Sequence, residues 1–443
     1  MSGSLLTFAS QIEWLRGPRV QRWLLRGLLA AAAIIFFQEI GHDGDFGAYL
    51  LVGRLVLEGK HIYTAAPEGL NTWPPFFSLL CVPLALMDEL SPWFSRGLWL
   101  LLNLILVAAI LGLLARAIYG RGFGFHSESE NLSPASPEIL IPLLLSSRYV
   151  ISNFDHLQIN ILLFYVTFGG MVLQATRREI AGGIAIGCAA AIKVMPALFI
   201  PYLLYRRRWR AAGSAILAAA SFSLSPILFF GWTRFLDYLI AWRHALGRGW
   251  SVGKMNQSVY AMIDRLVGHG IAPVMSQGVN ALPRSGNVGV VAILAITIAA
   301  FSALALWVFR TPSTHERWAA LSEWSVVFIA SVIFGPVAWK AYFIVLLLPN
   351  ALLFAAILSP SIDTATRRTL AILLAVSFVL GGLMSQGIVG KKLSWAMDMT
   401  SVVTVSALIQ MIAALFLRWR LVSQSGDGAI GWEEIDGRRR NDR

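Results

Sequence analysis

The stretch LWLLLNLILVAAILGLLA, from Leu98 to Ala115, decides the fold class of this chain. A second apolar block runs from Val288 to Val308. Blocks of about 20 apolar residues match the thickness of the hydrocarbon core of a bilayer. Of the 443 residues, 57% are hydrophobic and 14% are charged, whereas a soluble domain carries about 25% charged residues. The sequence therefore predicts an all-α, polytopic membrane protein with about twelve transmembrane helices.

The basic residues predict how the chain threads through the membrane. The net charge is +12, and the basic residues lie mostly at the ends of the apolar blocks. The positive-inside rule accounts for this placement better than a nucleic-acid partner does. Clusters at Arg16 to Arg26, Arg206 to Arg210 and Arg418 to Arg420 fall on one side if the helices alternate in direction. We therefore expect a multi-pass protein with both termini in the cytoplasm and no nucleic-acid partner.

A single membrane domain is predicted over residues 1–420. Its long outward loops cover residues 41–91 and 231–287. Residues 421–443 are polar and predict a disordered cytoplasmic tail.

Two apolar segments are irregular. The segment from Pro74 to Leu90 is short for a span, and counting it as one would place Arg116 and Arg121 outside. It is therefore predicted to be an interfacial or re-entrant helix. A helix break is expected near Lys193 and Pro196. Broken helices at membrane depth are tolerated only where they are buried or line a cavity.

The first outward loop carries the strongest candidate for acid–base chemistry. It opens with Asp43 and Asp45, and the residues from Phe46 to Glu58 mix apolar side chains with Arg54. That mixture predicts a helix lying in the membrane interface. A carboxylate beside it could act as a general base. Alternatively, both aspartates could cap the N-terminus of the interfacial helix.

Other polar residues interrupt the apolar blocks. Lys193 and Lys340 could each bind a phosphate, or could extend to the headgroups from the membrane. Asn256 and Gln257 lie in the second long loop, where they could bind sugar hydroxyls or cap a helix. Two further polar residues precede an apolar block and could face a cavity or the headgroup region. These are Gln158 and Asn160.

Several kinds of chemistry lack their usual residue patterns. The sequence has no Walker-type glycine loop and no Gly-x-Ser-x-Gly elbow. Its seven histidines are scattered, and Cys81 and Cys188 are its only cysteines. These observations predict no metal site, no cofactor and no disulfide framework.

A set of short motifs, in a fixed order, resembles glycosyltransferase family 87. The first is Asp45-Phe46 followed by Tyr49, Gly59, Tyr63 and Trp73-Pro74-Pro75-Phe76. The later ones are Gln158-Ile159-Asn160, Ala191-Ile192-Lys193-Val194-Met195-Pro196, the basic run Arg206 to Arg210, Asn256-Gln257-Ser258 and Pro336-Val337-Ala338-Trp339. The resemblance extends from about Asp45 to Pro349. It implies a C-type glycosyltransferase fold in a bacterial plasma membrane.

The resemblance also implies an activity and its partners. Members of this family use polyprenyl-phosphate sugars, with mannose the best-known sugar, and the acceptor is a lipid or glycan outside the cytoplasm. Asp45 would be the catalytic base, and transfer would invert the anomeric centre. The individual residues and the resemblance together predict substrate binding at Asp43, Tyr49, Arg54, Trp73, Gln158, Asn160, Lys193, Asn256, Gln257, Trp339 and Lys340. Membrane lipids would surround the protein; the sequence leaves its oligomeric state open.

The chain departs from the family pattern at two motifs. His156-Leu157 stands where a glycine commonly precedes the Gln-x-Asn motif. Lys340 and Tyr342 occupy the stretch where a histidine often follows the Pro-x-x-Trp motif. Lys340 could replace that histidine as a cation if the histidine binds the donor phosphate, whereas a histidine that handles a proton would imply a different mechanism for this chain. Two non-enzymatic functions stay open: a transporter or lipid flippase, and an envelope assembly protein without catalysis of its own.

Overall fold

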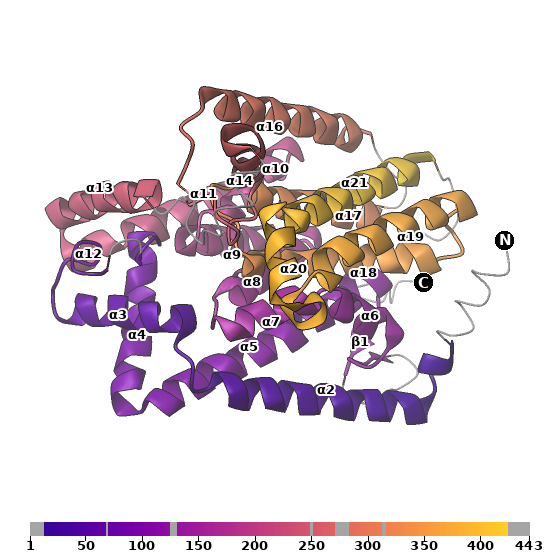
Figure 1. The fold of residues 1–443 in the computed structure, drawn as a ribbon, viewed down its shortest axis with the longest axis horizontal. Coiled ribbons are helices and arrows are strands. Elements are labelled where there is room, and N and C mark those ends of the chain that lie inside the picture. The colour runs from indigo at the N-terminus through magenta and orange to yellow at the C-terminus, as the bar shows by residue number, and fades with distance from the viewer. Residues whose placement is uncertain are drawn as a thin grey trace, which may run out of the picture. The chain divides into compact units, whose positions relative to one another are not determined.

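The computed structural model describes residues 13–67, 70–124, 131–248, 251–270, 283–311 and 316–423. The chain is almost entirely helical (Figure 1), with one short pair of parallel strands. In chain order the elements are α2 (Pro18–Glu39), α3 (Gly44–Leu57), α4 (Pro75–Leu90), α5 (Pro92–Leu114), η1 (Ala115–Tyr119), β1 (Gly122–Phe123), β2 (Asn131–Leu132), α6 (Pro137–Leu145), α7 (Ser147–Asp155), α8 (Asn160–Ala175), α9 (Glu179–Ile192), η2 (Met195–Leu198), α10 (Phe199–Tyr205), α11 (Trp209–Leu224), α12 (Pro226–Phe230), α13 (Trp232–Arg248), α14 (Val259–Ile263), η3 (Asp264–His269), α16 (Val288–Phe309), α17 (Glu316–Ile333), η4 (Lys340–Leu346), α18 (Leu347–Leu358), α19 (Thr364–Phe378), η5 (Val379–Leu383), α20 (Gln386–Met399) and α21 (Val402–Ser423).

The predicted all-α, polytopic architecture is confirmed. Among the described residues, seven helices are long and apolar enough to cross a membrane. This number is smaller than the twelve expected, because several predicted spans form shorter apolar helices, such as Asn160–Ala175 and Glu179–Ile192. The described part of the second predicted outward loop, residues 231–287, contains the helices α13, α14 and η3.

The chain forms two compact units, which we describe separately. The Asp45 unit comprises residues 34–107 and 151–251. The Lys340 unit comprises residues 108–150 and 252–443, together with the N-terminal residues up to 33, as far as they are described. The predicted division into a domain over residues 1–420 and a tail stays a prediction, because the residues beyond Ser423 lie outside the described part.

Small residues allow the helices of the Asp45 unit to approach closely. A Cβ atom at Gly183 would lie 2.2 Å from the carbonyl oxygen of Ala211, and one at Gly187 would lie 2.4 Å from that of Ala215. Within each helix the two small residues are four positions apart, Gly183 and Gly187 in α9 and Ala211 and Ala215 in α11. This is the small-xxx-small spacing that brings membrane helices together. The contact fixes α9 against α11 and so fixes the end of α9, where Lys193 begins an extended turn.

Aromatic packing fixes the N-terminal part of the same unit. Tyr49 of α3 contacts the rings of Trp73, Phe77 and Trp99, with centroid distances of 4.9, 5.1 and 6.0 Å. Edge-to-face contacts of this kind orient side chains as well as bury them. The cluster holds α3 against α4 and α5, and therefore fixes the first turn of α3, which carries Asp45.

Candidate active site

The turn before α3 places Asp45 against a second segment of the chain. Gly44 has a φ of +48°, and a Cβ atom there would lie 2.5 Å from the carbonyl oxygen of His156. Glycine is therefore required, because it tolerates positive φ and leaves room for the neighbouring backbone. The Asp45 amide donates to that same His156 carbonyl over 2.8 Å. The indole of Trp99 in turn donates to the Leu157 carbonyl over 3.0 Å.

A chain of hydrogen bonds runs from Asp45 to Lys193. The Gln158 amide donates to the Asp45 carboxylate. Its oxygen accepts from Nδ2 of Asn160 over 3.0 Å, and Oδ1 of Asn160 accepts from the Lys193 ammonium over 2.9 Å. Asn153 supports the chain, since its side-chain oxygen accepts from Asn160 over 3.3 Å. The structure thus brings together four residues that the sequence singled out in three separate motifs.

Burial divides this chain of residues into a middle and two ends. The side chains of Gln158 and Asn160 are buried, whereas Asp45 and Lys193 are partly exposed. Two neutral, buried amides therefore lie between two partly exposed charged groups and fix the distance between them. A carboxylate and an ammonium held in this way can accept a proton and stabilise an anion, respectively.

The surroundings of Asp45 adjust its acidity. Burial raises the pKa of the Asp45 carboxyl above its ordinary value. The positive charges of Lys193 and His156 and the hydrogen bond from Gln158 lower it and so oppose this effect in part. A carboxylate with a raised pKa is a stronger proton acceptor, which suits a general base.

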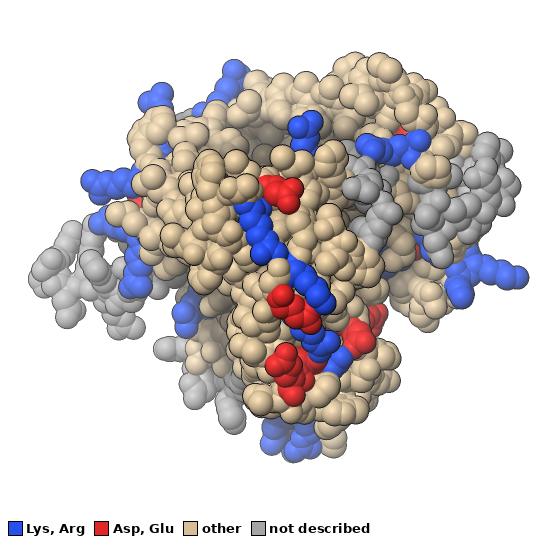
Figure 2. All heavy atoms as spheres, turned by 90° about the vertical axis from the view of Figure 1, so that its left-hand side faces the viewer, with Lys and Arg blue, Asp and Glu red and all other residues tan. Residues whose placement is uncertain are grey.

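Neither Asp43 nor Asp45 caps the N-terminus of α3 with a side-chain hydrogen bond. Asp43 occupies the N-cap position of α3 without a side-chain capping hydrogen bond. Its carboxylate instead pairs with Arg96, which also contacts Asp88 over 3.3 Å, and Asp88 pairs with Arg54 over 2.5 Å. Figure 2 faces the side of α3, α4 and α13, where basic and acidic side chains lie next to one another. Asp43 and Arg54 are therefore committed to ion pairs, and their predicted role in substrate binding stays a prediction.

Two of the predicted binding residues belong to the hydrophobic packing of the Asp45 unit. Tyr49 is fully buried and Trp73 is 8% exposed, and both lie in the aromatic cluster around α3. The Trp73 carbonyl accepts from the Tyr63 hydroxyl over 2.7 Å. Their position supports α3, and their contact with a substrate remains a prediction.

The remaining predicted residues lie in the Lys340 unit. Lys340 pairs with Asp398 over 2.5 Å, and Arg148 pairs with the other oxygen of Asp398 over 3.0 Å. The side chain of Trp339, next to Lys340, is 36% exposed. We call Arg148, Lys340 and Asp398 the Asp398 triad. Its net charge is one positive unit when all three side chains are ionised.

Asn256 and Gln257 hold two predicted motifs together. Oδ1 of Asn256 accepts from the Ala338 amide over 3.1 Å, and its Nδ2 donates to the Pro336 carbonyl over 3.0 Å. The Gln257 side chain donates to the Asp398 carbonyl over 2.7 Å. The alternative of a helix cap applies to the next residue, Ser258, whose hydroxyl accepts from the Ala261 amide. Sugar binding by Asn256 and Gln257 remains a prediction.

The sequence did not single out Arg148, Asp398 or Asn153, each of which contacts a residue in another helix or loop. Arg148 and Asp398 are 250 positions apart, and Asn153 bonds to a residue of the next helix. A charged residue near an apolar block was the available signal for Arg148, but no spacing pattern links it to Asp398. Among the described residues, no group of three or more His, Cys, Asp or Glu side chains could hold a metal ion; the absence of a metal requirement stays a prediction.

Comparison with known proteins gives the context for this geometry. The chain is 29% identical over 257 residues to a polyprenol-phosphate-mannose-dependent alpha-(1-2)-phosphatidylinositol mannoside mannosyltransferase of Mycobacterium tuberculosis, covering 52% of this chain and 56% of that protein. It is 24% identical to the protein of the same description from Mycolicibacterium smegmatis, covering 73% of each. The chain thus spans little more than half the length of the first relative.

Solved structures and a family profile complete the comparison. The chain resembles ArnT from Cupriavidus metallidurans, in the apo state and bound to undecaprenyl phosphate, with TM-scores of 0.40 and 0.37 and identities of 13% and 14%. Each match covers 88% of this chain and 76% of that structure. The profile of glycosyltransferase family 87 matches residues 71–336. Because this match includes more than half of the sequence, the chain belongs to glycosyltransferase family 87.

Proposed function

We propose that this membrane glycosyltransferase moves a mannosyl group from a polyprenyl-phosphate donor to a hydroxyl of a lipid or glycan acceptor, with inversion, on the extracytoplasmic face. The single observation that carries the proposal is the hydrogen-bonded connection from Asp45 through two buried amides to Lys193. The names of the two mycobacterial relatives support the donor and the sugar.

The proposed reaction is a direct displacement in which each end of this connection has one role. The acceptor hydroxyl attacks the anomeric carbon while the Asp45 carboxylate takes its proton. The bond between that carbon and the phosphate oxygen breaks, and polyprenyl phosphate leaves with the bonding electrons. Lys193 stabilises the negative charge that grows on this phosphate. Gln158 and Asn160 hold the Asp45 carboxylate and the Lys193 ammonium in place. These two groups therefore need not move when the substrate binds.

The donor also explains why the site needs no strong general acid. Polyprenyl phosphate is already an anion when it leaves, so a cation serves it better than a proton donor does. The attacking hydroxyl needs a base, and the leaving phosphate needs a positive charge. In this proposal Asp45 and Lys193 of the Asp45 unit supply them.

The experiment uses the purified protein with radiolabelled polyprenyl-phosphate mannose and membrane lipid acceptors. Wild type should form a mannosylated product whose new linkage is α if the donor is β. Asp45→Asn should lower the transfer rate by about 10²- to 10⁴-fold, the usual contribution of a general base, with unchanged expression. Glu58→Gln is the matched control, since Glu58 is exposed at the C-terminal end of α3 and is not among the predicted binding residues. Near-normal turnover by Asp45→Asn would rule out this base.

Sidedness is tested by cysteine labelling in a background with Cys81→Ala and Cys188→Ser. Glu58→Cys follows α3, and Arg210→Cys lies in the basic run at the start of α11; both positions are exposed. A membrane-impermeant thiol reagent applied to intact cells should label Glu58→Cys, and should label Arg210→Cys after permeabilisation only. The opposite pattern would place the Asp45 side in the cytoplasm.

A further inference from the structure

A polar cavity lies in the Asp45 unit, between the loop that follows α3 and the helix α13. Its volume is about 670 Å³, within the range usual for ligand sites. It is lined by His61, Tyr63, Thr64, Ala66, Pro67, Asn71, Asp237, Ile240, Ala241, His244 and Ala245. We call it the His61 pocket. The transfer mechanism described above uses none of these residues.

One face of α13 forms a wall of the pocket. Asp237, Ile240, Ala241, His244 and Ala245 are spaced at i, i+3, i+4, i+7 and i+8, the spacing that places side chains on a single helix face. The small side chain of Ala241 leaves a hollow in the middle of this wall. The two polar side chains, Asp237 and His244, lie about two helical turns apart on either side of that hollow.

The loop wall is fixed by its own hydrogen bonds. Nδ1 of His61 accepts from the backbone amides of Tyr63 and Thr64 over 3.2 and 3.1 Å. The proton of the neutral imidazole is therefore on Nε2, which donates to the Asp237 carboxylate over 3.0 Å. Trp242 adds a further link from α13, since its indole donates to the Thr72 carbonyl over 2.9 Å. The pocket is thus formed before any ligand enters.

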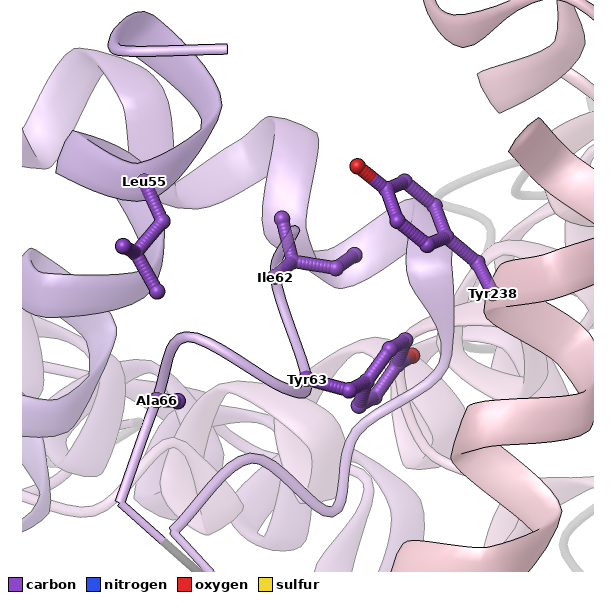
Figure 3. Packing of buried hydrophobic residues seen from close by; sticks show 5 residues of the cluster. All are labelled: Leu55, Ile62, Tyr63, Ala66 and Tyr238. Atoms are coloured by element: carbon purple, nitrogen blue, oxygen red, sulfur yellow. The ribbon is translucent and has the colours of Figure 1, made fainter. Parts of the chain in front are cut away.

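Apolar packing closes the base of the pocket. Figure 3 shows Ile62 and Tyr63 of the loop between Leu55 of α3 and Tyr238 of α13. The ring of Tyr238 also lies edge-on to His61, with a centroid distance of 4.8 Å. This hydrophobic cluster makes the loop and the helix one body, so that the polar groups above it keep their spacing.

Asn71 provides the observation that points to a ligand. Its side chain is 3% exposed, and its Nδ2 donates to the Ile62 carbonyl over 2.9 Å. Its Oδ1 is buried and accepts no hydrogen bond from any described residue. Buried acceptors are almost always satisfied, because an unsatisfied one loses its hydration without compensation. A ligand hydroxyl in the pocket would supply the missing donor.

The lining selects one class of ligand. The described residues that line the pocket include an amide, two imidazoles and a carboxylate, and none of these described residues is a lysine or arginine. Such a set favours neutral hydroxyl groups over a phosphate, which needs cationic or multiple N–H donors. The Tyr63 hydroxyl donates to Trp73, whose ring packs on Tyr49 of α3. The pocket and the helix that carries Asp45 are therefore mechanically joined.

We propose that the His61 pocket binds the hydroxyl-rich sugar or polyol head of the acceptor, away from the charged donor phosphate. This inference rests on the proposed transferase function and adds to it the site that selects the acceptor. Asn71 and His244 would hydrogen-bond the acceptor hydroxyls, and Asp237, oriented by His61, would accept from one of them.

The test compares pocket variants with a matched surface variant in transfer assays that use phosphatidylinositol mannoside as acceptor. Asn71→Ala and His244→Ala should each raise the acceptor KM about five- to tenfold, the effect of one lost hydrogen bond. Ala241→Phe should raise it further by filling the hollow. The donor KM should be unchanged in all three, which also shows that they fold. Arg243→Gln is the control, because Arg243 is exposed on α13 and does not line the pocket.

A binding measurement separates this inference from the transferase proposal. Saturation-transfer NMR with methyl α-mannoside and the protein in nanodiscs should show binding to wild type and none to Ala241→Phe. One outcome is that wild type binds the glycoside, Ala241→Phe does not, and wild type transfers no mannose. That outcome would refute the transferase proposal and support a polyol-binding site. An active wild type with unchanged acceptor KM in all three pocket variants would overturn the pocket, as would a wild type that neither transfers mannose nor binds the glycoside.

Discussion

Lys193 and Lys340 present the same functional group in two different settings. In the Asp45 unit, Lys193 donates to a neutral amide oxygen, that of Asn160, over 2.9 Å. In the Lys340 unit, Lys340 lies 2.5 Å from a carboxylate oxygen of Asp398. The first lysine is linked to its counter-charge, Asp45, through two amides, whereas the second contacts its counter-charge directly.

This difference separates a bridged arrangement of charges from a directly paired one. The amides between Asp45 and Lys193 hold a carboxylate and an ammonium apart, as the proposed mechanism requires. Asp398 must balance both Lys340 and Arg148. Removing a partner from a buried ion pair leaves an uncompensated charge, which is strongly destabilising. We therefore expect changes in the Asp398 triad to affect stability first, and changes around Asp45 to affect catalysis first.

The largest effect should come from Asp398→Asn. It would leave Arg148 and Lys340 as neighbouring cations with side chains only 7% and 22% exposed. The free energy of unfolding should fall by about 3–5 kcal/mol, measured by denaturant unfolding in detergent. Asp43→Asn is the control, because its exposed carboxylate should change stability by less than about 1 kcal/mol. A similarly small change for Asp398→Asn would show that the triad is not needed for stability.

The two lysines should differ in their effect on catalysis. Lys193→Met should lower kcat/KM for the donor by about 10²- to 10³-fold, because it removes the cation that stabilises the leaving phosphate. Lys340→Met should cost less, since Arg148 and Asp398 can still pair with each other. Steady-state kinetics at several donor concentrations measure both. Equal losses for the two variants would contradict the distinction drawn between the sites.

Asn160→Ala tests the neutral bridge itself. It removes the acceptor of the Lys193 ammonium and the donor to Gln158 together. A loss of about 1–3 kcal/mol in transition-state stabilisation is expected, because a buried polar group is left unsatisfied. The readout is kcat at saturating donor, with Thr176→Ala, at the residue that follows the same helix, as the control. An unchanged kcat would mean that Lys193 and Asp45 are positioned without the amide.

The pH dependence of transfer should reveal the environment of Asp45. Activity needs its carboxylate, so the rate should fall as the pH decreases through a pKa that burial has raised above the ordinary 3.8. The hydrogen bond from Gln158 favours the charged carboxylate and lowers this pKa. Gln158→Leu should therefore move the acidic limb of kcat/KM to higher pH, by up to about one unit. A shift to lower pH would exclude Gln158 as a partner of the ionised base.

The comparison also shows how far the sequence predicts this protein. The long apolar blocks predicted the helical membrane fold, because apolar residues in numbers that match the bilayer leave few alternatives. The apolar block from Leu98 to Ala115 lies within the helix Pro92–Tyr119, and the break expected near Lys193 follows the end of α9. The sequence did not predict the helix α13 within residues 231–287, since this helix is amphipathic and too polar to appear as an apolar block.

The candidate site was predicted residue by residue but not as an arrangement. Motif order selected Asp45, Gln158, Asn160 and Lys193, and the structure connects them through side-chain hydrogen bonds. Motif order also selected Tyr49, but the structure shows its side chain buried in the aromatic cluster that packs α3 against its neighbours. Residue type and order alone could not distinguish these two situations.

The sequence by itself determined the helical membrane fold, the family and the residue types that the chemistry needs. Those properties depend on composition and on local order along the chain. Only the tertiary structure decided that the buried amides of Gln158 and Asn160 meet Asp45 at one end and Lys193 at the other, that Arg148 shares Asp398 with Lys340, and that α13 completes the His61 pocket. The physical reason is that each of these contacts joins residues far apart in sequence. Helix packing brings them together, and no local pattern records it.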